Sequence, residues 1–131
     1  MPTDPDSPID VVHAFLVAMS TLDYDTALKY ISDDCEYENI PMPGSTVHGP
    51  SGVRSLLEPF FAPTIENEFV ILREATTGPV VMLERLDRHH VASGWFELPV
   101  TGVFEVHDRQ ITLWRDYFNL ATLDPMFAAA T

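Results

Sequence analysis

The order of two hydrophobic patterns along the chain is the feature that most limits its possible folds. Before residue 61, apolar residues mostly recur at steps of three and four, as in amphipathic helices, apart from one alternating stretch at 34–39. From residue 65 to residue 119 they alternate every second position, as in β-strands. Helices followed by a run of strands indicate an α+β domain.

Three helices are expected, at about residues 8–22, 23–31 and 49–61. Each is preceded by residues typical of a helix N-cap or a turn. Ser7 and Asp23 are the expected N-caps of the first two. Pro59 is expected to kink or shorten the third.

Alternation predicts five strands, at about 34–39, 65–75, 79–90, 96–107 and 110–119. Short turns separate the last four, which should form a largely antiparallel meander. A curved sheet wrapped over the helices leaves a hollow between the two layers, where a small-molecule site is expected.

Composition excludes several kinds of partner. The 131 residues suit one domain, and 20 acidic against 7 basic side chains give a net charge of −13. This balance argues against binding of nucleic acid or an anionic membrane. The lone Cys35 cannot form an intramolecular disulfide and is expected to be a buried structural residue, and the start of the chain lacks the pattern of a secretory signal. A soluble cytoplasmic protein is the expectation.

Three charged residues fall on strand faces that should point into the hollow. Arg85 and Asp87 share a face of one strand, and Asp116 lies between two aromatic residues on another. A carboxylate there is costly unless it is paired, and Arg85 can bridge the two acids across the sheet. The cluster is either a structural ion network or an active site.

Tyr37 and Asn39 share one face of the 34–39 strand and could hold a water against Asp116. The alternatives are a half-buried strand tyrosine and a turn residue before a proline. His89 and His90 should point to opposite faces of their strand, so no shared metal site is expected. No phosphate-binding loop or nucleophile elbow is present, and no nucleotide cofactor is expected.

Several short motifs resemble those of the limonene-1,2-epoxide hydrolase family, within the cone-shaped NTF2-like and SnoaL-like domains. In order and spacing the resemblance covers about residues 7–123. The motifs are Tyr37-Glu38-Asn39-Ile40-Pro41, Glu84-Arg85-Leu86-Asp87, Gly102-Val103-Phe104 and the run 111–118. The resemblance implies one domain over residues 1–131, with a curved, mixed, mostly antiparallel sheet around an apolar pocket.

The resemblance also implies a reaction. Asp116 would be the base that deprotonates a water held by Tyr37 and Asn39, and Asp87 the acid that protonates the epoxide oxygen, with Arg85 between the two acids. A lipophilic epoxide would become a vicinal diol in one step, with no cofactor and no covalent intermediate.

The expected pocket walls are apolar or aromatic. The residues proposed to line them are Met19, Phe60, Phe61, Leu83, His89, Leu98, Val100, Trp114 and Phe118. The chain departs from the limonene enzyme at His89, where an aliphatic residue is expected, and at Asn119, where an Asp is expected.

Two other functions fit the same fold. One is a proton-transfer enzyme like ketosteroid isomerase or a dehydratase, and the other is a non-catalytic binder of a hydrophobic small molecule. A homodimer formed through the sheet is also expected, with Leu86, Val103 and Leu113 on the outward face.

Overall fold

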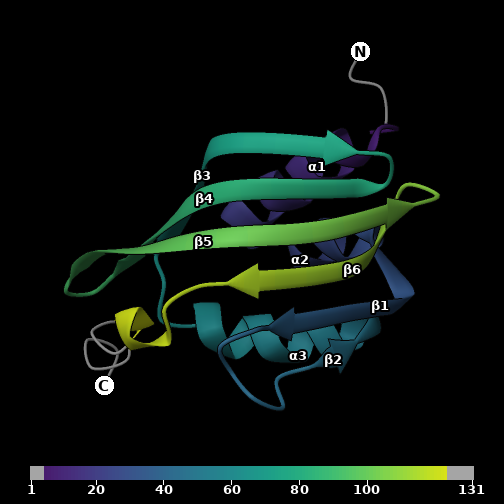
Figure 1. Ribbon diagram of the computed structural model, residues 1–131. Helices are drawn as coiled ribbons and strands as arrows, with labels where there is room; N and C mark the ends of the chain where they lie inside the picture. The colour runs from purple at the N-terminus through teal and green to yellow at the C-terminus, as the bar shows by residue number, and fades with distance from the viewer. Residues whose placement is uncertain (1–4, 124–131) are drawn as a thin grey trace.

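The computed structural model describes residues 5–123, which form one curved six-stranded sheet with helices on one side (Figure 1). The helices are α1 (Pro8–Ser20), α2 (Tyr24–Ala27) and α3 (Gly49–Phe61), with the 3-10 turns η1 (Leu28–Tyr30) and η2 (Leu120–Leu123). The strands are β1 (Ile31–Asn39), β2 (Val47–His48), β3 (Glu66–Thr77), β4 (Val80–Val91), β5 (Gly94–His107) and β6 (Gln110–Tyr117).

The sheet has the order β2-β1-β6-β5-β4-β3. Strands β3 to β6 form the expected antiparallel meander, and β1 then pairs with β6 in parallel. This one parallel pairing places an early strand beside the last strand. The sheet is therefore mixed and mostly antiparallel, and the α+β prediction is confirmed.

The two longer helices cover one face of the sheet and leave the other uncovered in the single chain (Figure 1). Ser7 caps α1 as predicted, because its Oγ accepts a hydrogen bond from the backbone N–H of Asp10 at 3.3 Å. The apolar stripe of α1, including Phe15 and Met19, is buried against the sheet. Cys35 is buried in the same core, and burial raises the pKa of its thiol to about 12.

The prediction of the second helix, at about 23–31, is wrong about where the helix ends. It stops at Ala27, and Ile31 already begins β1, where it pairs with Ile111 of β6. A register shift between Ile31 and Glu36 interrupts the alternation, so the first half of the strand does not show a period of two. The first helix and the last four strands begin and end within two residues of the predicted positions.

Two smaller differences concern the segment before β3. The two-residue strand β2 was not predicted, because it is too short to show alternation and is defined only by its pairing with β1. Helix α3 continues past Pro59 and ends at Phe61, so the proline does not shorten it. In the part of the chain that the structure describes, no helix is both long and apolar enough to cross a bilayer.

Candidate active site

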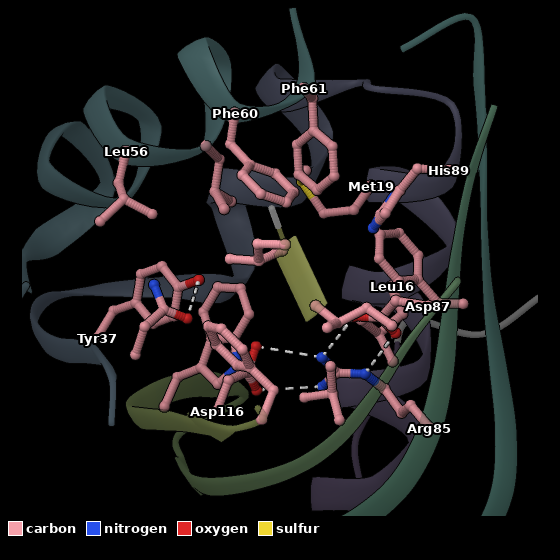
Figure 2. Close-up of a pocket in the computed structure, with 18 of the residues that line it drawn as sticks. Leu16, Met19, Tyr37, Leu56, Phe60, Phe61, Arg85, Asp87, His89 and Asp116 are labelled. Carbon is pink, nitrogen blue, oxygen red and sulfur yellow. Dashed lines mark hydrogen bonds and ion pairs between the residues drawn. The ribbon is translucent and has the colours of Figure 1, made fainter. Parts of the chain in front are cut away.

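A buried cluster of three charged side chains lies on the helix-covered face of the sheet (Figure 2). Arg85 donates from Nε to Asp87 Oδ1 and from Nη2 to Asp87 Oδ2, both at 3.0 Å. Toward Asp116 it donates from Nη2 to Oδ2 at 3.1 Å and from Nη1 to Oδ1 at 3.3 Å. Arg85 is 2% exposed and each carboxylate residue 6% exposed. The trio that the sequence predicts is therefore brought together, with one guanidinium paired to two acids.

Gly102 makes this bridge possible. Strand β5 lies between β4, which carries Arg85, and β6, which carries Asp116 directly opposite Gly102. A Cβ atom at Gly102 would lie 2.6 Å from Arg85 Nη1 and 3.0 Å from Asp116 Oδ1. The glycine thus leaves the space through which the guanidinium crosses β5, a role that was not predicted although Gly102 is part of a quoted motif.

Replacing Gly102 with Ala is expected to abolish most activity by pushing Arg85 away from Asp116. Gly78→Ala is the control, since Gly78 has a positive φ of 54° but nothing within 4 Å of its added Cβ. That control should cost about 1 kcal/mol of stability and leave turnover unchanged. Steady-state kinetics and urea unfolding of both variants test this, and normal turnover by Gly102→Ala would contradict the assigned role.

The cluster carries two potential negative charges against one fixed positive charge. Burial raises the pKa of Asp116, while Arg85 and the Trp114 hydrogen bond oppose that rise. Burial alone would lower the pKa of Arg85, but the two neighbouring carboxylates outweigh it and the pKa is raised, so the guanidinium stays charged. The guanidinium thus stays positively charged between the two carboxyl groups and is paired with both of them.

Trp114, on the same strand as Asp116, holds the Asp116 carboxylate in place. Its indole Nε1 donates to Asp116 Oδ1 at 2.8 Å, and its ring stacks on Tyr37 with the ring centres 3.8 Å apart. The sequence predicts Trp114 only as a pocket wall. Trp114 and Asp116 are two residues apart and therefore share a strand face, and an indole N–H is a hydrogen-bond donor. This spacing could have predicted the hydrogen bond.

Tyr37 and Asn39 lie beside Trp114 and Asp116 because β1 runs parallel to β6 in that register. The Tyr37 hydroxyl donates to Asn39 Oδ1 at 3.3 Å. Burial raises the pKa of Tyr37 above its ordinary value, so the hydroxyl remains protonated. Both residues predicted to hold a water are thus buried next to the carboxylate they would serve.

The cluster lies in the wall of a cavity of about 280 Å³. Of the predicted wall residues, those that line it are Met19, Phe60, Phe61, His89, Leu98, Val100, Trp114 and Phe118. Leu83 does not, and this prediction is corrected: the side chain is fully buried in the main core, one row beyond Arg85 on the same strand face.

Further lining residues come mainly from the helices and were missed by the sequence analysis. They are Phe15, Leu16, Met42, Leu56, Leu57, Pro59, Phe69 and Leu123. Residues three and four positions before Met19 and Phe60 lie on the same helix faces as those two. That spacing would have predicted four of the missed residues from α1 and α3.

His89 and His90 point to opposite faces, as predicted. His89 is 1% exposed, whereas His90 is half-buried and its Nδ1 lies 3.2 Å from Glu66 Oε1. Burial, aided by the positive charge of Arg85, lowers the pKa of His89 to about 4. His89 is therefore a neutral imidazole at neutral pH.

This lowered pKa predicts an acid-sensitive fold. An unfolded histidine titrates near 6.5, so between pH 6.5 and 4 the unfolded chain binds a proton that the folded chain does not. The contribution of His89 to the free energy of unfolding is complete above pH 6.5, and it falls by about 3 kcal/mol as the pH is lowered to 4. Urea unfolding at a series of pH values should show a shallower acid decline for His89→Leu than for the wild type, and equal declines would contradict the prediction.

The fold and the site define a class: an α+β domain whose curved sheet carries two buried carboxylates paired with one guanidinium in the wall of a mostly apolar cavity. The model of the limonene-1,2-epoxide hydrolase catalytic domain matches residues 6–129. The chain belongs to this family and is an epoxide hydrolase.

Individual relatives agree with this assignment. Epoxide hydrolase EphG of Mycobacterium tuberculosis (strain ATCC 25618 / H37Rv) is 37% identical over 109 residues, which are 83% of this chain and 71% of that protein. A solved LEH-like epoxide hydrolase of M. tuberculosis superposes with a TM-score of 0.76 at 34% identity, covering 94% of this chain and 88% of that one.

A more distant structure shows the fold alone. A SnoaL-like protein of Shewanella putrefaciens CN-32 has a TM-score of 0.81 at 15% identity and covers 98% of both chains. The predicted cone-shaped NTF2-like fold is confirmed by these comparisons.

Proposed function

We propose that the protein converts a lipophilic epoxide to a vicinal diol in one step, with Asp116 as general base and Asp87 as general acid. The observation that carries the proposal is the guanidinium of Arg85, which holds both buried carboxylates in the wall of one apolar cavity. An epoxide needs a positioned water on one side and a proton for the departing oxygen on the other.

The hydrogen bonds support this division of roles. Among residues 5–123, Asp116 accepts three of them, two from Arg85 and one from Trp114, whereas Asp87 accepts two, both from Arg85. The extra hydrogen bond from Trp114 and the neighbouring Tyr37 and Asn39 support Asp116 as the group that takes a proton from water, which leaves Asp87 as the proton donor. Burial raises the pKa of Asp116, which makes the ionised group a stronger base than an exposed aspartate.

Tyr37 and Asn39 complete the water site. A water beside Asp116 can give one proton to the carboxylate, while the hydroxyl and the amide supply the further donor and acceptor that orient its lone pair. As the water oxygen bonds to one epoxide carbon, the ring carbon–oxygen bond breaks and the oxygen takes the proton of Asp87. The two acids then exchange a proton before the next turnover.

The apolar lining supports a lipophilic substrate. Apart from the catalytic cluster, Asn39 and His89, the side chains that surround the cavity are aromatic, aliphatic or thioether groups. A cavity of about 280 Å³ is at the small end of ligand pockets, which favours a compact epoxide.

Single-turnover hydrolysis in water labelled with heavy oxygen tests the one-step reaction. With enzyme in excess, the label is expected in the diol and not in any enzyme carboxylate. If the first turnover instead places label in Asp116 or Asp87, the diol oxygen came from a covalent ester and the proposed mechanism is wrong.

The alternative of a proton-transfer enzyme like ketosteroid isomerase is less well supported. Such a reaction has less need of a guanidinium between two acids, yet Arg85 contacts both. The further alternative of a non-catalytic binder predicts that Asp116→Asn leaves ligand affinity unchanged and that no epoxide is hydrolysed.

We also propose that two copies pair through the uncovered face of the sheet. Leu86, Val103 and Leu113 are half-buried on this face, and Met82, the cross-strand partner of Val103, is 48% exposed. Sedimentation equilibrium is expected to give a dimer, and the double variant Met82→Glu with Val103→Glu a monomer. A monomeric wild type would refute the pairing.

A further inference from the structure

A chain of hydrogen bonds outside the catalytic cluster fixes the tautomer of His89. Thr64 Oγ1 donates to the carbonyl oxygen of Phe61 at 2.7 Å and accepts from Asn67 Nδ2 at 3.0 Å. The amide orientation of Asn67 is thereby set, and its Oδ1 lies 2.6 Å from His89 Nδ1. An oxygen can only accept, so Nδ1 carries the proton and Nε2 holds a free lone pair.

Within residues 5–123 the hydrogen bond of the His89 ring is the one at Nδ1, and Nε2 is not among the fully buried atoms without a partner, so Nε2 is accessible from the cavity. His89 lines the cavity, and Figure 2 shows its ring on the same side as Asp87 and across from Tyr37. The rings of Phe60, Phe61, Phe69 and Phe96 surround the imidazole, with centre-to-centre distances of 5.5 to 6.4 Å.

In a wall that is otherwise mostly apolar, this acceptor is exceptional. It can be satisfied only by a molecule inside the cavity, either water or a polar group of the ligand. An aliphatic side chain at this position would line the cavity without offering such an acceptor. The preoriented acceptor is therefore suited to a group that arrives with the ligand.

We infer that His89 Nε2 accepts a hydrogen bond from a hydroxyl group of the substrate, so that the preferred substrate is a hydroxylated lipophilic epoxide. This inference rests on the proposed function and narrows its substrate class. Asp87 and His89 are two residues apart on the same strand face, which separates their side chains by roughly 7 Å. The hydroxyl therefore lies several bonds from the epoxide oxygen that Asp87 protonates, too far for the new diol hydroxyls to take its place.

The ring epoxides of carvomenthene and α-terpineol provide a matched pair of probes, because they differ by one hydroxyl group on the carbon outside the ring. The wild type is expected to favour the α-terpineol epoxide by about tenfold or more in kcat/KM. His89→Leu should lose this preference or reverse it. Asn67→Ala keeps the imidazole of His89 but removes the acceptor that holds the proton on Nδ1, so either ring nitrogen can carry it. This variant should therefore lose part of the preference.

His90→Leu, a change at the neighbouring residue on the opposite face, is the control and should keep the wild-type preference. Dissociation constants of both epoxides, measured by calorimetry on the Asp116→Asn variant with and without His89→Leu, separate this inference from the proposed reaction. If binding shows the hydroxyl preference but neither compound is hydrolysed, the inference holds and the proposed function fails. An Asp116→Asn protein that binds the two compounds equally, or binds neither, overturns the inference, as does an equal loss on both compounds when His89→Leu is added.

Discussion

Replacing Asp116 with Asn is expected to lower kcat for epoxide hydrolysis by about 1,000-fold or more. The amide cannot take a proton from water, and its NH₂ group cannot accept the hydrogen bonds that Arg85 and Trp114 now donate to two carboxylate oxygens. Affinity for the diol product should change far less than turnover. Steady-state kinetics and product binding by calorimetry measure the two effects separately.

Asp87→Asn is expected to cause a loss of similar size, because an amide is too weak an acid to protonate the departing oxygen. Asp108→Asn is the matched control. Asp108 lies in the turn between β5 and β6 with a φ of 51°, a conformation that Asn tolerates well, so this variant should keep full activity. Near wild-type turnover by either Asp116→Asn or Asp87→Asn would remove that residue from the mechanism.

Replacing Arg85 with Met is expected to destabilise the fold by about 3 to 5 kcal/mol and to abolish activity. The substitution leaves two carboxyl groups buried without the cation that both of them face. The loss of stability should become smaller as the pH falls, because protonation of the carboxyl groups removes the unpaired charges. Urea unfolding at neutral and acid pH measures both effects.

A triple variant separates the charge effect from simple loss of packing. Arg85→Met combined with Asp87→Leu and Asp116→Leu removes all three charges and is expected to be far more stable than Arg85→Met alone, though inactive. A triple variant no more stable than the single one would show that packing, and not unpaired charge, explains the loss.

The sequence was sufficient to predict the charged cluster because strand alternation has a fixed period of two. Arg85 and Asp87 had to share a face, and so did Trp114 and Asp116. Alternation does not define the register, that is, the pairing of individual residues with those on the neighbouring strand. The role of Gly102 and the contact of Asn67 with His89 depend on that register, and neither was predicted.

The errors in the fold have related causes. Ile31 was assigned to a helix because the irregular pairing in β1 hides the alternation of its first half. Leu83 was placed in the pocket because it shares a strand face with Arg85, but sharing a face does not tell how far the cavity extends along the strand. Both errors concern tertiary contacts between segments far apart in the sequence.

The parallel pairing of β1 with β6 also has a consequence for the order of folding. Asp116 and Trp114 come from the last strand, whereas Tyr37 and Asn39 come from the first, so contacts between distant parts of the chain complete this side of the cavity. Such contacts require closure of a long loop, and they form late when local hairpins such as β3–β4 form early. A nascent chain that has not yet reached β6 carries Arg85 and Asp87 without Asp116, so the charged cluster should assemble only after β6 has been synthesised.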